Sequence, residues 1–317
     1  MVKKFALMMV VGMQLVGVGT ALAAEVNFSG DASLKYEKDT MDGEADHSGV
    51  MSTVKVKMEA DLGNGWSLFG RIGAQHATDP VLADFNPDAY KSGKKTVVGF
   101  DQFGISYKQD DLTYRFGRQD ATVGTTALLY SRSDSNIGKH QFVDGLSVTG
   151  KTGVVDLSVL AAREDNVTSE KNKIYAVRAG FSPEEDFSYG LTLGRYHYDG
   201  GDTTNHWAVD TTYKAGKHSW TMEYTKSNRS EQNKAYAANW NYDFDGQLGA
   251  YVTAFRVEAN GDMGGQSDFD NNNKGIYYGL TYKFSDVDGV EVVYKDQKTL
   301  DAGVNNTKLE ATYTHSF

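Results

Sequence analysis

Residues 54–72 read VKVKMEADLGNGWSLFGRI, and this stretch decides which fold the sequence predicts. Val54 and Val56 alternate with lysines, which is the period of two that is typical of a β-strand with one apolar face. Asn64 and Gly65 favour a two-residue type I′ turn, because both residue types tolerate positive φ. The alternation resumes beyond the turn, so the stretch predicts an antiparallel hairpin.

The same period of two runs along the rest of the chain. We predict sixteen strands, at about 25–37, 51–62, 66–75, 97–108, 112–120, 141–150, 154–163, 172–182, 187–197, 205–215, 217–228, 234–244, 247–257, 275–285, 289–297 and 306–317. Their connections are alternately short and long, and the three prolines, Pro80, Pro87 and Pro183, fall in these connections. Up-and-down barrels of the outer membrane place short turns at one end and long loops at the other.

The predicted fold is therefore an all-β transmembrane antiparallel barrel of 16 strands. Strands of about 9–11 residues cross a bilayer when they are tilted. Aromatic residues near the strand ends predict girdles at the membrane surfaces, namely Tyr36, Trp66, Tyr107, Tyr213, Trp220, Tyr242, Tyr282 and Phe284. A soluble sandwich or β-solenoid also has short alternating strands, but its turns need not alternate in length.

The N-terminus has the pattern of an export signal. Lys3 and Lys4 precede an apolar run over 5–18, and Ala21-Leu22-Ala23 supplies a small-x-small cleavage site. We expect residues 1–23 to be a signal peptide and residues 24–317 to form the barrel domain in the outer membrane.

Composition narrows the possible functions. The net charge of −10 argues against nucleic acid as a partner, because nucleic acid requires a basic face. The seven histidines show no metal-ligand spacing and no nucleophile motif appears, so we predict neither an enzyme nor a cofactor or metal site. Residues 268–275 are weakly similar to a calcium loop but lack the later Glu. We interpret them as a polar extracellular loop, with divalent-ion bridging to lipopolysaccharide as the alternative.

One insert breaks the alternation: residues 119–140 read QDATVGTTALLYSRSDSNIGKH. The flanking strands should be neighbours, yet a hairpin needs only two to five connecting residues. An insert of this length is either a surface flap or a loop folded into the space that the strands enclose.

Five features follow one another along the chain: the signal followed by Ala24-Glu25-Val26, residues 54–72, KTVVGFDQFGISY at 95–107, YRFGRQD at 114–120 before the long insert, and the terminal Phe317. In these features the chain resembles the trimeric general-diffusion porins of Gram-negative outer membranes. The resemblance implies a homotrimer in contact with outer-membrane lipids and lipopolysaccharide. It also implies that the insert narrows the pore, and that Phe317 is an assembly signal for the barrel-assembly machinery; His315 stands where a Tyr is common.

Parity along the strands predicts a lumen with balanced charges. We predict that the pore wall and its constriction include Arg71, Arg115, Arg118, Asp120, Arg132, Asp134, Lys55, Lys57, Glu59 and Arg178. In the resembled family, acidic residues on the insert face arginines on the opposite wall; here Arg71 and Arg115 are the expected wall cations, with Asp120 and Asp134 as the loop anions.

The predicted function is passive diffusion of small hydrophilic solutes and ions, with a weak preference for cations that follows from the net acidity. A substrate-specific oligosaccharide porin is the alternative, because an aromatic ladder in the lumen would stack on sugar rings. The candidate ladder is Phe69, Phe100, Tyr251, Phe255 and Tyr277. A third hypothesis is an adhesin or phage-receptor barrel that acts through its loops.

Overall fold

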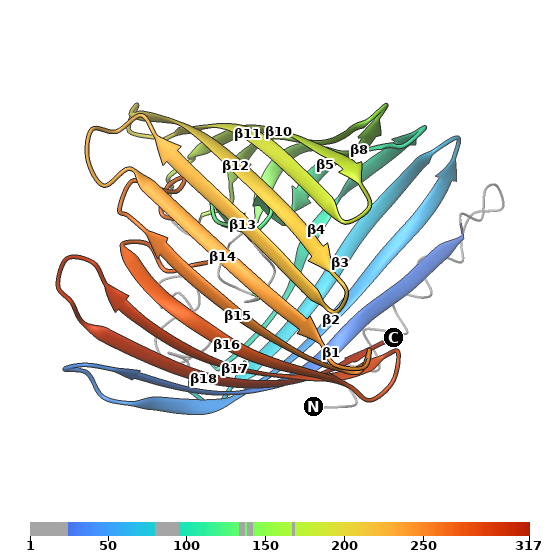
Figure 1. The fold of residues 1–317 in the computed structure, drawn as a ribbon. Coiled ribbons are helices and arrows are strands. Elements are labelled where there is room, and N and C mark those ends of the chain that lie inside the picture. The colour runs from blue at the N-terminus through green and yellow to red at the C-terminus, as the bar shows by residue number, and fades with distance from the viewer. Residues whose placement is uncertain (1–24, 80–94, 133–136, 138–141, 167–168) are drawn as a thin grey trace.

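Sixteen antiparallel strands form a closed barrel in the computed structural model, which describes residues 25–79, 95–132, 137, 142–166 and 169–317 (Figure 1). The barrel strands are β1 (Val26–Met41), β2 (His47–Gly63), β3 (Trp66–Ala77), β4 (Thr96–Gln109), β5 (Leu112–Gln119), β8 (Val143–Thr152), β9 (Val155–Glu164), β10 (Lys173–Glu184), β11 (Phe187–His197), β12 (Thr203–Ala215), β13 (His218–Ser227), β14 (Lys234–Asp243), β15 (Leu248–Val257), β16 (Asn273–Lys283), β17 (Asp288–Thr299) and β18 (Asn305–Ser316). Two short strands, β6 (Ala121–Val123) and β7 (Tyr130–Arg132), pair separately. The predicted fold class is confirmed.

Neighbouring strands in the sequence are neighbours in the barrel, and β1 pairs with β18 to close it. The closure continues past β18, because Gly30 N donates to Phe317 O at 2.8 Å and Phe317 N donates to Gly30 O at 3.0 Å. The described part of the chain contains no helix with the length and apolarity that a membrane span needs.

Side chains alternate between two very different surroundings. The outward positions are exposed and apolar, for example Leu34, Ile72, Leu191 and Leu280, as expected for a wall that faces lipid. Aromatic residues gather at the short-turn end of this surface, where Trp66 stacks on Tyr107 with ring centroids 4.5 Å apart. The predicted girdle is thus present at that end, with Tyr213 and Trp220 paired in the same way.

Two predictions are wrong, one of the face of Phe100 and one of the position of Pro183. A bulge in the β3–β4 pairing places Phe100 opposite Ile72, so Phe100 faces outward and stacks on Phe103 rather than lining the lumen. Period-two counting cannot foresee a bulge, because one extra residue reverses every later side chain. Pro183 lies inside β10, where the β10–β11 register is irregular between Phe181 and Glu184. Pro80 and Pro87 lie outside the described residues.

The turn between β2 and β3 adopts the predicted conformation. Asn64 has φ of 53° and Gly65 has φ of 82°. A Cβ on Gly65 would lie 2.3 Å from Lys108 O, whereas a Cβ on Gly63, whose φ is also 82°, would meet nothing within 4 Å.

We expect Gly65→Ala to lower the free energy of unfolding by more than about 1 kcal/mol, through positive φ and the collision with the Lys108 carbonyl. Gly63→Ala should lower the free energy of unfolding less, because it introduces the strain of positive φ without a collision. Urea unfolding in lipid vesicles measures both. Equal losses would show that the contact with Lys108 contributes nothing.

Candidate pore and its inward loops

The insert after β5 lies inside the barrel over its described residues. Strands β6 and β7 pair antiparallel as a small hairpin, with Val123 opposite Tyr130. Leu128, Leu129 and Tyr130 are fully buried. Since an apolar side chain can be buried in this region only against the inner wall or another loop, the insert folds inward rather than forming a surface flap.

Apolar contacts tie the insert to three parts of the inner wall. Ile137 packs with Met51, Ala77 and Val97 on β2, β3 and β4. Leu129 and Tyr130 belong to a cluster on the other side of the lumen; its other members are Ala121, Val123, Val143, Leu160, Ala162, Ile174, Ala176, Tyr196, Ala208 and Met263. Leu128 reaches β14 and β15, where it packs with Ala235, Ala237, Phe255 and Val257, and it also packs with Phe269 of the loop that follows β15. The insert therefore crosses the lumen.

Polar contacts fix the tip and the base of this hairpin. At the tip, Thr126 donates from its backbone N at 2.7 Å and its Oγ1 at 2.8 Å to Glu223 Oε2 on β13. At the base, Arg132 Nη2 lies 3.0 Å from Glu164 Oε2 on β9, and Tyr130 donates its hydroxyl to Glu164 Oε1 at 3.1 Å. Burial raises the pKa of Tyr130 well above its ordinary value, so the hydroxyl keeps its proton.

A second loop, residues 258–272, also folds inward, and the sequence did not reveal it. Its backbone hydrogen-bonds to the insert three times: Met263 N to Leu129 O at 2.9 Å, Ser131 N to Gln266 O at 2.5 Å, and Asp268 N to Ala127 O at 3.0 Å. Residues 268–275 were interpreted as a polar extracellular loop; the stretch is not uniformly polar, because Phe269 is buried against Phe255 with ring centroids 4.7 Å apart, and its last three residues belong to β16. Met263 and Phe269, apolar residues in a polar stretch, were the available signal.

The second loop contains a buried carboxylate. Asp262 accepts from Ser267 N at 3.0 Å and from Asn271 Nδ2 at 2.8 Å. Burial raises the pKa of Asp262 to about 6, against the opposing effect of these donors. The described residues contain no group of three or more His, Cys, Asp or Glu side chains arranged to hold a metal ion.

We expect docking of the second loop to strengthen as the pH falls. A carboxyl group whose folded pKa is raised stabilises the folded state most when protonated, and that contribution is lost as the pH rises through about 6. Amide hydrogen exchange over 258–272, corrected for the intrinsic rate, should show greater protection at pH 4.5 than at pH 7.5. Asp262→Ala should flatten the difference; an unchanged difference in this variant would assign it to another group.

The side of the barrel wall that packs on Leu129 and Tyr130 is called the clustered side. The wall opposite it carries alternating charges on β17, β18, β1 and β2. Lys295 Nζ lies 3.0 Å from Glu310 Oε1, and Lys35 Nζ lies 3.9 Å from the same oxygen. Lys55 pairs with Asp31 at 3.2 Å on the neighbouring strands. These inward-facing pairs form a polar surface that water and ions can follow.

Several predicted site residues meet in one hollow on this side. Lys57, Glu59, Arg71, Arg115 and Asp120 all line it. Arg71 is 1% exposed and donates two hydrogen bonds to Asp101, at 2.9 and 2.8 Å. Its main role is therefore to stabilise the barrel wall. Arg115 lies over the Phe69 ring, 4.0 Å from its centroid. Asp101 was not among the predicted residues, because the bulge that turns it inward has no signature in the sequence.

The remaining predicted residues lie elsewhere. Arg118 shares its face with Phe116 and stands opposite Phe103, so it faces outward, where it pairs with Asp144 at 2.9 Å; placing it in the lumen was wrong. Arg178 lies on the clustered side and binds Asp210 through two hydrogen bonds, at 2.9 and 2.6 Å. Arg132 anchors the insert, as described above. Asp134 lies outside the described residues.

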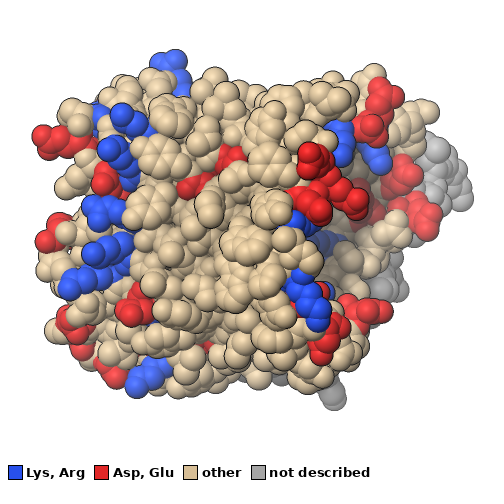
Figure 2. Space-filling model, in the orientation of Figure 1, with Lys and Arg blue, Asp and Glu red and all other residues tan. Residues whose placement is uncertain are grey.

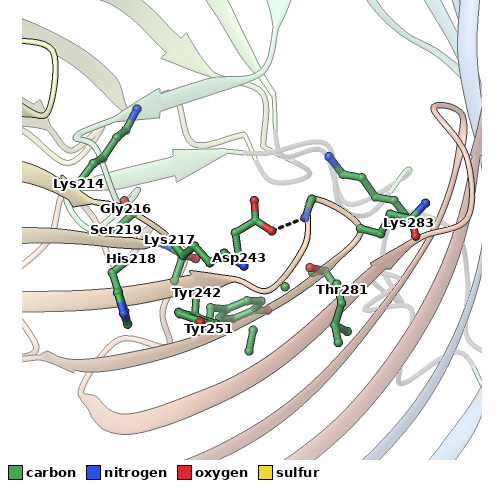
Figure 3. Close-up of a pocket in the computed structure, with 16 residues that line it drawn as sticks. Lys214, Gly216, Lys217, His218, Ser219, Tyr242, Asp243, Tyr251, Thr281 and Lys283 are labelled. Atoms are coloured by element: carbon green, nitrogen blue, oxygen red, sulfur yellow. Dashed lines mark hydrogen bonds between the residues drawn. The ribbon is translucent and has the colours of Figure 1, made fainter.

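The mouth at the short-turn end is lined by lysines. Lys214, Lys217 and Lys283 surround a hollow of about 420 Å³ with Asp243, whose Oδ1 accepts from Gly246 N at 2.6 Å (Figure 3). Tyr251 and Thr281 lie on the neighbouring strands below them. Tyr213 and Tyr282 face outward, so Lys214 on β12 and Lys283 on β16, each the next residue along, take inward positions.

A closed antiparallel barrel with a hydrated, charged wall and a loop across its lumen defines an outer-membrane channel. The family model of Gram-negative porins matches residues 8–317. The chain belongs to this family, which places it in the outer membrane. A search of curated proteins found no match.

Solved structures with the same fold come from several bacteria. OmpF of Salmonella typhi, in complex with daunomycin, is 14% identical, with a TM-score of 0.62 over 92% of this chain and 98% of that one. A triple mutant of the Rhodopseudomonas blastica porin is 12% identical, with a TM-score of 0.61 over 92% and 100%. The trimer form of OmpT, an outer membrane protein of Vibrio cholerae, is 15% identical, with a TM-score of 0.59 over 92% and 99%.

Proposed function

We propose that this porin is a general diffusion channel for small hydrophilic solutes and ions, without catalytic activity. The observation that carries the proposal is the insert that crosses the lumen, anchored to Glu223 on one side and packed through Ile137 on the other. An obstruction of this kind selects by size, while the ion-paired wall keeps the remaining path wet. Passage then needs neither an energy source nor a covalent step.

We also propose a weak preference for cations. The chain has 42 acidic against 32 basic residues. The hollow beside the insert is lined by Lys57, Arg71 and Arg115 and by Glu59 and Asp120. Asp101 neutralises Arg71, so the local balance is even and the preference should be small. A charge ring of one sign would give strong selectivity instead.

Single-channel recording in planar bilayers tests the function directly. We expect large ohmic currents that maltodextrins do not block. In a salt gradient, the reversal potential should be small and should have the sign of the equilibrium potential of the cation. Block by a sugar would favour the oligosaccharide channel, and a folded protein without conductance would contradict both channel hypotheses and leave the loop-receptor hypothesis.

The sugar-specific alternative has little support from the geometry. Phe100 faces outward, and Phe255 is only 3% exposed beneath Phe269 and Leu128. The Tyr251 hydroxyl already donates to Glu291 at 2.9 Å. Because a stacking ladder needs a row of open aromatic faces, the five candidate residues cannot form one.

The same proposal includes maturation and assembly. We infer that residues 1–23 are removed on export, that the protein is a homotrimer as in the OmpT trimer form, and that the barrel-assembly machinery recognises the last strand. Phe317 supports the last point, since its backbone completes the pairing with Gly30 at the barrel closure.

A further inference from the structure

The hollow at the short-turn end of the lumen carries an excess of positive charge. This mouth hollow is lined by Lys214, Lys217 and Lys283, against the single carboxylate of Asp243. Figure 3 shows Lys214 and Lys283 on opposite sides of Asp243, with both side chains extending into the same space. Three lysines against one carboxylate leave an excess of two positive charges, so the mouth hollow attracts anions.

The protein itself uses little of this charge. Asp243 Oδ1 accepts from Gly246 N at 2.6 Å, and Lys217 donates to a carbonyl oxygen of the same turn. Within the described residues, the side chains of Lys214 and Lys283 form no ion pair and no hydrogen bond, and Asp243 Oδ2 has no partner either. Two ammonium groups and one carboxylate oxygen are therefore left for a ligand.

The lysines of the mouth hollow lie in water, beyond the lipid-facing part of the wall. On the outer surface, charged residues gather at the two edges of a broad band that carries few of them (Figure 2). Tyr213 and Tyr282, which are exposed on the outer wall, immediately precede Lys214 and Lys283. The mouth hollow is thus open to dissolved solutes.

One aromatic ring forms a flat surface in the same hollow. Tyr251 lies against Gly279, where an added Cβ would be 2.1 Å from two atoms of the ring. The Tyr251 hydroxyl donates to Glu291 at 2.9 Å, which holds the ring along the wall below Asp243 (Figure 3). Within the described part of the chain, no other ring and no cation stacks on Tyr251. A single open face of this kind is too little for an oligosaccharide ladder, but it is enough for one planar ring.

One row of the sheet joins this aromatic face to the lysines. The residues opposed in turn across β12–β16 are Lys214, Ser219, Asn241, Tyr251 and Gly279. Three strand spacings of about 4.8 Å, or about 14 Å, separate the backbones of Lys214 and Tyr251. Ser219 and Asn241 lie between them and add a hydroxyl and an amide. The row therefore offers a cation, neutral hydrogen-bonding groups and an aromatic face, in that order.

We propose that the mouth hollow binds nucleotides, with the base stacked on Tyr251 and the phosphate held by Lys214 and Lys283. Every base has a flat face that stacks on an aromatic ring, and lysine binds phosphate as a point charge. A phosphate monoester carries about 1.5–2 negative charges near pH 7, which matches the excess of charge in the hollow. The ribose then lies between base and phosphate, where the free oxygen of Asp243 accepts from a ribose hydroxyl.

The size of the hollow agrees with this ligand class. Its volume of about 420 Å³ lies within the roughly 300–1,000 Å³ of small-molecule sites. The inference rests on the proposed channel for its biological meaning, because it names a class of solute that the mouth of that channel retains.

The test measures binding of adenosine monophosphate (AMP) to the folded protein in detergent by calorimetry, so it needs no current. One variant, Tyr251→Leu, removes the ring, and a second, Lys214→Gln with Lys283→Gln, removes two ammonium groups. The matched control, Lys108→Gln with Lys151→Gln, removes two lysines from other short turns. Heat-modifiable mobility in gels shows that each variant folds.

We expect Tyr251→Leu to weaken AMP binding at least about fivefold, which is the loss of one stacking contact. The lysine variant should weaken it at least about tenfold, and the control should keep the native affinity. Adenosine and inorganic phosphate, which each supply half of the ligand, should bind the native protein more weakly than AMP. Unchanged affinity in either hollow variant, an equal loss in the control, or equal binding of AMP and one of its halves would each overturn the proposal.

Planar-bilayer recording separates this inference from the proposed channel. AMP should reduce native currents and leave those of the lysine variant unchanged. A folded protein that binds AMP through these residues without passing current would support the site and contradict the channel. Native currents from a protein that binds no AMP would support the channel and overturn the site.

Discussion

Excising the tip of the insert is expected to raise single-channel conductance at least about twofold, because flow through an aqueous pore follows its open cross-section. The variant replaces residues 124–129 with Asn-Gly. Val123 and Tyr130 are a directly opposed pair, so a two-residue type I′ turn can join them without changing β6 or β7. The excision removes Thr126 and Leu128, which carry the insert to β13 and β14.

The excision also leaves Glu223 without its Thr126 donors, and this needs its own control. Glu223→Gln in the excised background separates the loss of the obstruction from the exposed carboxylate. Thr126→Val, which removes one hydroxyl bond and keeps the tip, should change conductance little. A folded excision variant with native conductance would show that the insert does not lie in the ion path.

Arg132→Met is expected to lower the free energy of unfolding by about 3–5 kcal/mol, the usual cost of removing one partner of a buried ion pair. Glu164 is 1% exposed and Arg132 is 5% exposed, so the carboxylate cannot recover water when the guanidinium is lost. The Tyr130 hydroxyl at 3.1 Å, Asn172 Nδ2 at 2.8 Å and Asn166 Nδ2 at 3.1 Å would remain as its donors. Urea unfolding in lipid vesicles measures the loss.

Two further variants test whether burial is the cause of this loss. Arg132→Met with Glu164→Gln should recover much of the loss, because the neutral amide needs no counter-ion. Arg229→Met removes a cation from Asp202 on the surface, where the side chains are 35% and 58% exposed, and should lower the free energy of unfolding far less than Arg132→Met. Equal costs for Arg132→Met and Arg229→Met would refute the argument from burial.

The sixteen strands could be predicted because each is a local pattern. Alternation at Val54 and Val56, and an Asn64-Gly65 turn, depend only on residues next to one another. The predicted face was wrong where an extra residue shifted the alternation, as at the bulge that turns Phe100 outward. Arg118 is a different case: it has the parity of Tyr114 and Phe116 on β5, so the alternation itself places it outward, and the error was to count it with the insert.

The site was less predictable than the fold, because its contacts join distant parts of the chain. Thr126 and Glu223 are 97 residues apart, and nothing near either one identifies the other. The docking of Met263 on Leu129 likewise needs two loops to meet inside a barrel that has already closed. Burial made Arg71 and Arg132 mainly structural, and burial is a property of the folded chain.

The sequence by itself determined the strand number, the antiparallel order, the face that meets lipid and the location of the long insert, since period two and turn chemistry are short-range. Only the tertiary structure decided that the insert crosses the lumen, that residues 258–272 join it, and which carboxylate holds each cation. Those outcomes depend on which side chains a closed barrel brings within a few ångströms.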